Sequence, residues 1–300
     1  MKILLLGSNG QLGWQLQRSL AVVGEVTALH RHSAPLCGDL AQPGALALAV
    51  QTVAPDVIVN AAAYTAVDRA ESEPETAFAI NARACEVLAA QATRLGAWLV
   101  HYSTDYVFDG GGERPWTESD RTAPANVYGR SKLAGEQAVT AGAGRHLVLR
   151  TSWVFDTWGQ NFLKSILRAA AQRDSLNVVC DQWGAPTRAA LIADATAHIL
   201  LRLRPDLAGI YHLAAAGATQ WHAYASLAIA HAGECGMVLK TRPDQVHAIP
   251  SSQYPVAAAR PANSRLDTSK LRRTFELHLP PWQDGVRSVV AELAALGART

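Results

Sequence analysis

Short apolar runs and amphipathic stretches alternate along the first half of the chain. The apolar runs occupy residues 1–6, 25–29, 56–60, 97–102 and 145–149, and a further strand is expected to end near Asp39. Helical periodicity extends through residue 20, begins again near Pro43, and continues over residues 75–94. Strands that alternate with helices in this way predict an α/β fold with a parallel, doubly wound sheet.

The pattern loosens after residue 150, where polar, aromatic and proline-rich stretches separate helices expected at 163–172, 191–203, 223–231 and 282–296. A short strand at 209–213 is expected to return to the main sheet. We therefore predict a dinucleotide-binding domain at 1–150, with returning segments near 188–232. A smaller C-terminal α/β substrate-binding lobe would comprise residues 151–187 and 233–300.

Composition narrows the classes of function. Of the 300 residues, 49% are apolar, which is ample for a packed core, and 17% are charged. The net charge of +2 gives no electrostatic field that would attract nucleic acid or an anionic membrane surface. The four cysteines form no C-x-x-C pair, and the histidines form no metal-ligand spacing, so no structural metal is expected. Without a signal segment or a long apolar run, a soluble cytoplasmic protein is expected.

A glycine-rich turn follows the first apolar run directly. Gly7, Gly10 and Gly13 are spaced G-x-x-G-x-x-G at the start of a helical pattern. A strand, a glycine-rich turn and a helix N-terminus bring backbone N–H groups onto a pyrophosphate, as in Rossmann-type domains. The alternative is a tight turn with close helix packing. The predicted cofactor contacts in this turn are Gly7, Asn9, Gly10, Gln11, Leu12 and Gly13.

The residues after the second strand bear on which cofactor is used. An acidic residue commonly holds the adenosine ribose at this point, but the chain has His30-Arg31-His32. Because Arg31 can pair with a 2′-phosphate, we predict that NADPH is preferred, with NADH as the alternative if Arg31 faces water. Asp39 and Leu40 would lie near the adenine, although Asp39 could equally cap the helix that begins near Pro43.

A tyrosine and a lysine one helical turn apart are the main catalytic candidates. Tyr128 and Lys132 would project from the same face of a helix, where a nearby ammonium favours the phenolate. Thr104 would lie at the carboxyl end of a strand, where such sheets bind ligands, and its hydroxyl could hold a carbonyl. The alternative is a surface Tyr and Lys and a Thr that ends a strand. The small residues that would admit a cofactor after the 56–60 strand are Ala61, Ala62 and Ala63.

Seven stretches, which span nearly the whole chain, resemble the extended short-chain dehydrogenase/reductases and, within them, the dTDP-4-dehydrorhamnose reductase family. They are the glycine turn, Asn60–Asp68, Ser103–Gly110, Tyr128–Glu136, Arg150–Trp153, Asp181–Thr187 and Arg260–Leu266. The resemblance implies reduction of the C4 ketone of dTDP-4-dehydro-L-rhamnose, with Tyr128 as proton donor. It further implies that Lys132 holds the nicotinamide ribose and lowers the pKa of the phenol, while Thr104 orients the carbonyl.

The resemblance also implies the substrate contacts. Asp105 and Trp153 would contact the sugar, and the arginines of the Arg260-Pro-Ala-Asn-Ser-Arg265 stretch the nucleotide. Judged on its residues alone, that stretch favours a solvated loop over a diphosphate clamp, although its two fork-shaped donors would suit a diphosphate. The full set of predicted substrate contacts is Val67, Thr104, Asp105, Tyr106, Trp153, Asn161, Trp183, Arg260, Asn263 and Arg265.

One further departure from the family pattern and three alternative functions qualify this interpretation. Gln15 and Ala190 stand where some relatives carry carboxylates that hold a magnesium ion between subunits, so no metal is expected and a homodimer would form without one. A sugar-nucleotide dehydratase is disfavoured because Tyr106 follows Asp105 where a second carboxylate is needed; another reductase or an epimerase is excluded less firmly. A non-catalytic cofactor-binding regulatory subunit is disfavoured because the chain retains the Thr, Tyr and Lys.

Overall fold

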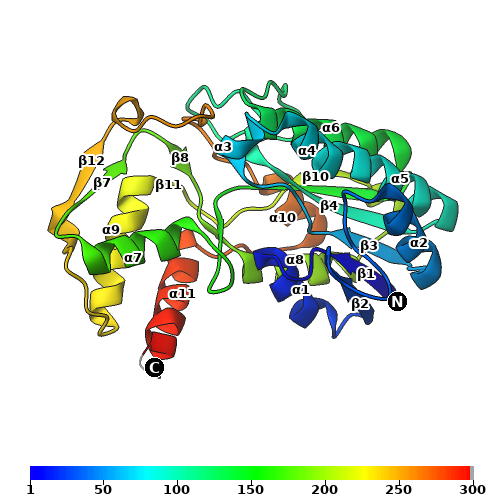
Figure 1. Cartoon of the computed structure of the whole chain (residues 1–300), viewed down its shortest axis with the longest axis horizontal. Helices are drawn as coiled ribbons and strands as arrows, with labels where there is room; N and C mark the ends of the chain where they lie inside the picture. The colour runs from blue at the N-terminus through cyan, green and yellow to red at the C-terminus, as the bar shows by residue number, and fades with distance from the viewer. Residues whose placement is uncertain (298–300) are drawn as a thin grey trace.

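The computed structural model describes residues 1–297 as a large domain beside a smaller lobe, with the C-terminal helix on the lobe (Figure 1). The large domain has a six-stranded sheet in the order β10-β5-β4-β3-β1-β2, and all its pairings are parallel. This arrangement confirms the predicted doubly wound sheet. The strands are β1 (Lys2–Leu6), β2 (Glu25–Leu29), β3 (Val57–Asn60), β4 (Trp98–Thr104), β5 (His146–Thr151) and β10 (Gly209–His212).

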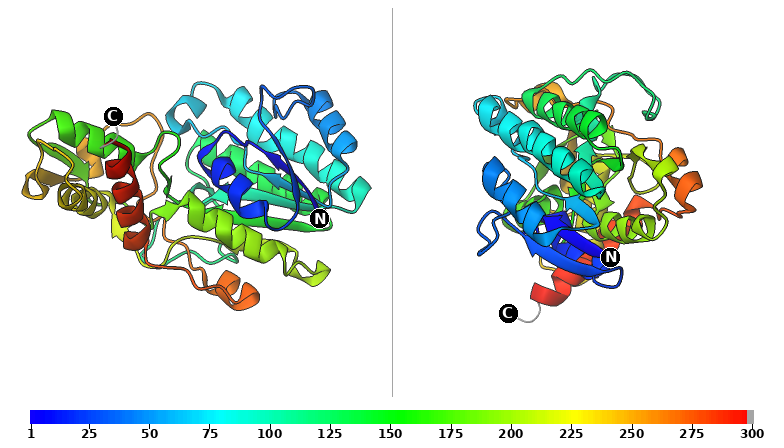
Figure 2. Two further views of the ribbon diagram at one scale, coloured as in Figure 1. Left: turned by 90° about the horizontal axis from the view of Figure 1, so that it is seen from below. Right: turned by 90° about the vertical axis from the view of Figure 1, so that its right-hand side faces the viewer.

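Helices cover both faces of the sheet (Figure 2). Leu4, Leu6 and Ile58 of the sheet pack with residues of α2 (Pro43–Val53) and α5 (Ala84–Leu95) in one core cluster. Ile3, Leu5 and Val59 alternate with them along the strands and pack on the other face. The helices of that face are α1 (Gln11–Leu20), α8 (Ala189–Leu200) and α10 (Ser269–Phe275).

The helix expected over 75–94 is interrupted in its middle. The structure has α4 (Pro74–Phe78), a π-helical turn (Ala79–Arg83), and then α5. The side chain of Asn81 in this turn bonds the backbone of Tyr64 and the hydroxyl of Ser131. Such π turns occur frequently at functional sites, and this one lies against α6 (Val127–Gly142), the helix that carries the catalytic candidates.

The smaller lobe contains strands that the sequence pattern does not reveal. Parallel strands β7 (Leu176–Val179) and β12 (Val246–Ile249) form its edge beside α7 (Phe162–Gln172), α9 (Trp221–Glu234) and α11 (Trp282–Gly297). The remaining short elements are α3 (Val67–Ala70), β6 (Val154–Phe155), β8 (Trp183–Gly184), β9 (Thr187–Arg188), β11 (Thr219–Gln220) and the 3-10 turns Asp105–Val107, Pro205–Leu207, Pro243–Gln245 and Ser251–Gln253.

Three predictions about organisation are wrong. No strand ends near Asp39, because its carboxylate accepts hydrogen bonds from the Ala41 N–H and the Gln42 side chain in a turn that leads into α2. Helix α9 was predicted among the segments that return to the large domain, but it packs in the lobe against α7 and α11. Helix α10, placed in the lobe, packs on the main sheet through Leu271 and Phe275. The predicted return of 209–213 is confirmed, since β10 pairs with β5.

Candidate active site

A cavity of about 440 Å³ lies at the carboxyl ends of the sheet strands. The backbone forms its floor: Gly7 has φ +82°, and a Cβ at Gly13 would lie 2.0 Å from the Gly7 carbonyl oxygen, so α1 approaches β1 as only glycine permits. The first turn of α1 holds no acidic residue. This helix N-terminus therefore suits an anion such as a pyrophosphate. The predicted residues in the lining are Gly7, Asn9, Gly10, Gln11, Leu12, Arg31, Asp39, Leu40, Ala61, Ala62, Ala63, Tyr128 and Lys132.

The two ends of this cavity differ in chemistry. Arg31 and Asp39 line one end. Asp39 does not cap α2: the N-cap residue is Gln42, no side chain bonds the helix N-terminus, and Asp39 bonds the Ala41 N–H in the preceding turn. Tyr128 and Lys132 line the other end. A dinucleotide with its adenosine near Arg31 and its nicotinamide near Tyr128 fits the donors present along the cavity. We call it the cofactor cavity.

Helix α6 is held close to the end of β4. Asn126 caps its first turn by accepting a hydrogen bond from the Gly129 N–H at 2.8 Å, as N-cap residues commonly do. A Cβ at Gly129 would lie 2.2 Å from the carbonyl oxygen of Tyr106, so only glycine allows this approach. The contact brings Tyr128 beside Thr104, the last residue of β4.

Tyr128 lies in an environment that keeps its phenol protonated. Burial raises its pKa well above the usual value and the nearby Asp105 carboxylate adds to this, while a hydrogen bond with Thr104 lowers it in part. Desolvation therefore opposes the effect that the resemblance assigns to Lys132. A protonated phenol is the form that a proton donor requires.

Thr104 and Asp105 form a buried pair next to the tyrosine. The Thr104 hydroxyl donates a hydrogen bond to the Asp105 carboxylate at 3.0 Å and accepts one from the Tyr106 N–H at 3.2 Å. Burial raises the pKa of Asp105 to about 6, although the nearby hydroxyls of Ser264 and Thr104 lower it in part. Since Ser103 lines the cofactor cavity and Tyr106 lines the next one, this pair lies where the two meet.

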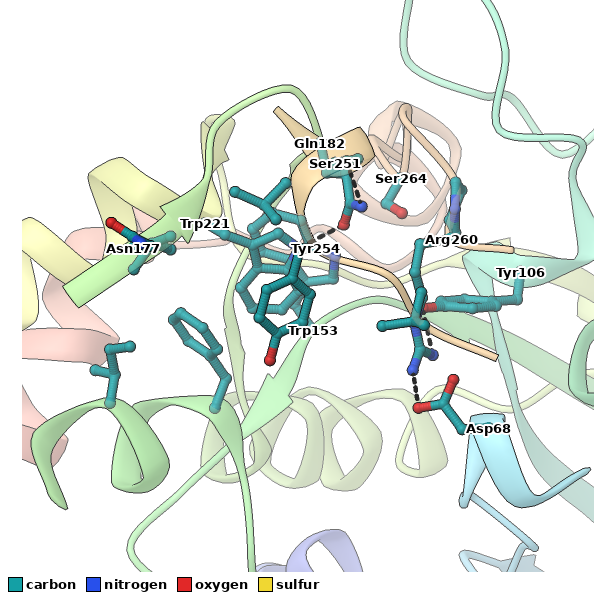
Figure 3. Close-up of a pocket in the computed structure, with 16 residues that line it drawn as sticks. Asp68, Tyr106, Trp153, Asn177, Gln182, Trp221, Ser251, Tyr254, Arg260 and Ser264 are labelled. Carbon is teal, nitrogen blue, oxygen red and sulfur yellow. Dashed lines mark hydrogen bonds and ion pairs between the residues drawn. The ribbon is translucent and has the colours of Figure 1, made fainter. Parts of the chain in front are cut away.

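A second cavity, of about 480 Å³, separates the large domain from the lobe (Figure 3). Asp68 and Tyr106 line it on the side of the large domain. Trp153 lines the lobe side and stacks on Trp221, with the two ring centroids 3.5 Å apart. The backbone of Trp153 has a φ of +48°, a strained value that such a bulky residue rarely adopts. We call this second cavity the substrate cavity, and its aromatic wall could stack a nucleobase. Its other lining residues are Phe162, Ile166, Asn177, Val178, Val179, Gln182, Ser251, Tyr254, Val256, Arg260, Pro261 and Ser264.

Arg260 reaches across the substrate cavity. Its guanidinium bonds the Asp68 carboxylate at 2.5 Å and the Tyr106 hydroxyl at 3.4 Å (Figure 3). Its side chain is 22% exposed, and that of Asp68 is 47% exposed, so this ion pair is hydrated and can be exchanged for another anion. Arg260 is therefore placed where a substrate diphosphate could replace Asp68.

Nine residues predicted as ligand contacts lie outside both linings, among them Thr104 and Asp105, which are buried where the two cavities meet. Asn263 instead ties the 109–117 loop to the chain by bonding the Gly111 and Arg114 carbonyls. Arg265 bonds Asn263 and lies over the ring of Trp183, which is 38% exposed. The remaining four are Gly13, which packs on Gly7; His30, bonded to the His32 N–H; Asn161, the cap of α7; and Val67, which begins α3.

Sequence reasoning missed several residues that the structure brings to the linings. Asp68 belongs to one of the stretches that carry the family resemblance, but no role was predicted for it. An acidic residue shortly after Ala61-Ala62-Ala63 was the signal that could have identified it. Tyr254, Ser251 and Gln182 come from loops with no distinctive pattern. The edge strand that supplies residues 177–179 was also missed.

The chain is similar to known proteins over nearly its whole length. The family model described as the RmlD substrate binding domain matches residues 1–295. The chain is 52% identical over 295 residues to a dTDP-4-dehydrorhamnose reductase of Salmonella typhimurium, covering 98% of each protein. The chain belongs to the dTDP-4-dehydrorhamnose reductase family. The predicted resemblance is thereby confirmed.

Solved structures of dTDP-4-dehydrorhamnose reductases share this fold. One from Clostridium acetobutylicum has a TM-score of 0.89 and 31% identity, covering 98% of this chain and 99% of its own. One from Bacillus anthracis, solved in complex with NADP, has a TM-score of 0.87 and 32% identity, covering 97% of this chain and 99% of its own. These matches extend over both the large domain and the lobe, so the Rossmann-type fold assignment is confirmed for the chain as a whole.

Two further findings bear on partners of such a reductase. Among residues 1–297, no cluster of three or more His, Cys, Asp or Glu side chains is arranged to hold a metal ion. No helix in the described part of the chain is both long and apolar enough to cross a bilayer.

Proposed function

We propose that the protein reduces the C4 ketone of dTDP-4-dehydro-L-rhamnose to the alcohol of dTDP-L-rhamnose. The observation that carries the proposal is that Tyr128 and Lys132 line a cavity suited to a dinucleotide, while Thr104 lies beside Tyr128 where this cavity meets one suited to a nucleotide sugar. Family membership supplies the substrate class.

The roles of the three residues follow from their positions. The Tyr128 hydroxyl, kept protonated by burial, delivers the proton to the carbonyl oxygen, and the Thr104 hydroxyl orients that carbonyl. Lys132 lines the cofactor cavity with its Nζ one turn from Tyr128, where it can bond the nicotinamide ribose. When bound, a reduced nicotinamide supplies the hydride.

The direct test is consumption of reduced cofactor with the purified sugar nucleotide. We expect the absorbance of the reduced nicotinamide to fall only when dTDP-4-dehydro-L-rhamnose is present, with dTDP-L-rhamnose as the product. Cofactor binding without turnover would instead indicate the regulatory alternative.

Arg31 is proposed to favour NADPH over NADH. Arg31 is exposed at the adenosine end of the cofactor cavity, where its guanidinium can pair with a 2′-phosphate. Arg31→Ala should lower kcat/KM for NADPH by about ten- to a hundredfold, the worth of a charge-assisted hydrogen bond, and leave the value for NADH nearly unchanged. Measuring both cofactors in both proteins makes NADH the internal control. An unchanged ratio would show that Arg31 does not bind the phosphate.

Arg260 is proposed to bind the substrate diphosphate in exchange for Asp68. Arg260→Ala should weaken binding of the dTDP-sugar by about ten- to a hundredfold and leave NADPH affinity unchanged, because Arg260 lines only the substrate cavity. Arg114→Ala is the matched control, since Arg114 also pairs with an aspartate, at 2.6 Å, but lies outside both linings. Titration calorimetry with both ligands measures the difference. Equal loss of both ligands would contradict the assignment.

A homodimer and a cytoplasmic location remain predictions for this reductase. Light scattering of the purified protein with and without magnesium tests the homodimer. Because Gln15 and Ala190 offer no carboxylate to a metal ion, magnesium should not change the measured mass.

A further inference from the structure

A buried histidine lies directly behind the proposed catalytic lysine. His101 of β4 is 1% exposed, and its Nε2 lies 3.3 Å from the Nζ of Lys132. Its Nδ1 faces the Asn60 amide nitrogen at 3.2 Å and the Cys85 sulfur at 3.7 Å. It lines neither cavity, and the mechanism above gives it no part.

The contacts of Lys132 leave one N–H free for a ligand. An ammonium has three N–H donors. One donates to the Tyr102 carbonyl oxygen at 2.7 Å, and a second is directed to His101 Nε2. Since Lys132 also lines the cofactor cavity, the third points toward the place proposed for the nicotinamide ribose and Tyr128.

We propose that His101 is a positioning residue of the active site, whose Nε2 accepts a hydrogen bond from the Lys132 ammonium and so aims the remaining N–H of Lys132 at the cofactor. This inference rests on the proposed function for its catalytic readout. His101 itself touches neither ligand, so it acts only through Lys132.

The charge state of His101 suits an acceptor. Burial and the adjacent Lys132 ammonium hold the pKa of His101 well below its usual value, so the imidazole is neutral and one ring nitrogen is free to accept. When Nε2 accepts from Lys132, Nδ1 carries the hydrogen, and the Asn60 amide must then turn its oxygen, which otherwise accepts from the Ala62 N–H, toward Nδ1. The sulfur of Cys85 is a second, weaker acceptor for the same Nδ1–H. Burial raises the pKa of this thiol to about 11, so it stays protonated and donates to the Asn81 carbonyl.

The hydrogen bonds among Asn60, His101 and Lys132 can also form when the Lys132 amine is neutral. The Asn60 amide then donates to Nδ1, and Nε2–H donates to the lysine amine. A hydrogen bond from an ammonium is about twice as strong as one between neutral groups, so the net effect of His101 favours the ammonium. Burial lowers the pKa of Lys132, while Cys85 and Glu136 raise it. The other ionisable groups facing this site are Tyr128 on its own helix and Arg150, which neutralises Glu136.

Three substitutions of His101 separate positioning from packing. The amide of His101→Gln can place its oxygen near the Nε2 position and still accept from Lys132, whereas His101→Asn is too short to reach it. His101→Met fills the space but offers only a weak thioether acceptor. His212→Asn is the matched control, because His212 is also a fully buried histidine of the same sheet but bonds the Trp116 carbonyl.

We expect His101→Asn and His101→Met to lose about ten- to a hundredfold in kcat, the range for a misdirected catalytic group, while KM for the sugar nucleotide stays within about threefold. The alkaline limb of the kcat/KM profile should move to lower pH, because the lost acceptor disfavours the ammonium. NADPH affinity, measured by fluorescence without substrate, should fall by about tenfold. His101→Gln and His212→Asn should keep values close to the parent.

The outcomes are distinct from those for the proposed function. A parent that binds NADPH but does not reduce the sugar nucleotide defeats the proposed function, and the affinity series alone then decides the role of His101. Unchanged affinity and pH profile in His101→Met overturn the inference. A loss in His101→Gln or His212→Asn equal to that in His101→Asn would also overturn it, since packing would then explain the effect.

Discussion

Replacing Tyr128 by phenylalanine is expected to lower kcat by about 10²–10⁴-fold, the usual contribution of a general acid. The substitution removes one hydroxyl and keeps the ring, which contacts Tyr106 edge-on at a centroid distance of 5.4 Å. NADPH affinity should therefore change little. Steady-state kinetics and fluorescence titration of NADPH measure the two effects.

Tyr211→Phe is the control for losing a buried tyrosine hydroxyl. Its hydroxyl bonds the Leu207 carbonyl at 3.0 Å, and it lines neither cavity. We expect this variant to keep the parent kcat. If Tyr128→Phe retained more than about half of the activity, Tyr128 could not be the proton donor.

Removing Glu136 is expected to cost about 3–5 kcal/mol of unfolding free energy, as is typical when one partner of a buried ion pair is deleted. Arg150 bonds both carboxylate oxygens of Glu136, at 2.8 and 2.6 Å, and their side chains are 3% and 2% exposed. Glu136→Ala would leave the Arg150 charge buried without its partner. Urea unfolding at equilibrium measures the loss.

The double variant Glu136→Leu/Arg150→Met tests whether the unpaired charge is the cause. Removing both charges should recover most of the lost stability, because hydrophobic replacements of a buried pair are often neutral. A cost below about 1 kcal/mol for Glu136→Ala would contradict the account, because it is the cost expected for a hydrated ion pair. Arg69→Ala, which breaks an exposed pair with Glu73, should cost less than about 1 kcal/mol.

The sequence was informative where local chemistry determines structure. The glycine spacing predicted the turn at Gly7 because a positive φ and a close approach leave few alternatives to glycine. The one-turn spacing placed Tyr128 and Lys132 in one cavity for an equally local reason.

Features that depend on tertiary contacts could not be read in this way. The π turn at Asn81 arises where its side chain bonds Tyr64 and Ser131, residues that are distant in sequence. The role of Asp68 depends on Arg260, which lies 192 residues away. His101 looks like an ordinary buried strand residue until α6 packs over it and brings Lys132 to its ring.

Isotope transfer is the most direct test of the central claim that this chain delivers a hydride to C4 of a dTDP-sugar. The protein is incubated with dTDP-4-dehydro-L-rhamnose and NADPH that carries deuterium at the transferable nicotinamide position, and the product is examined by NMR and mass spectrometry. We predict dTDP-L-rhamnose with deuterium at C4 of the sugar and at no other carbon. Product without deuterium, or no product despite NADPH binding, would contradict the claim.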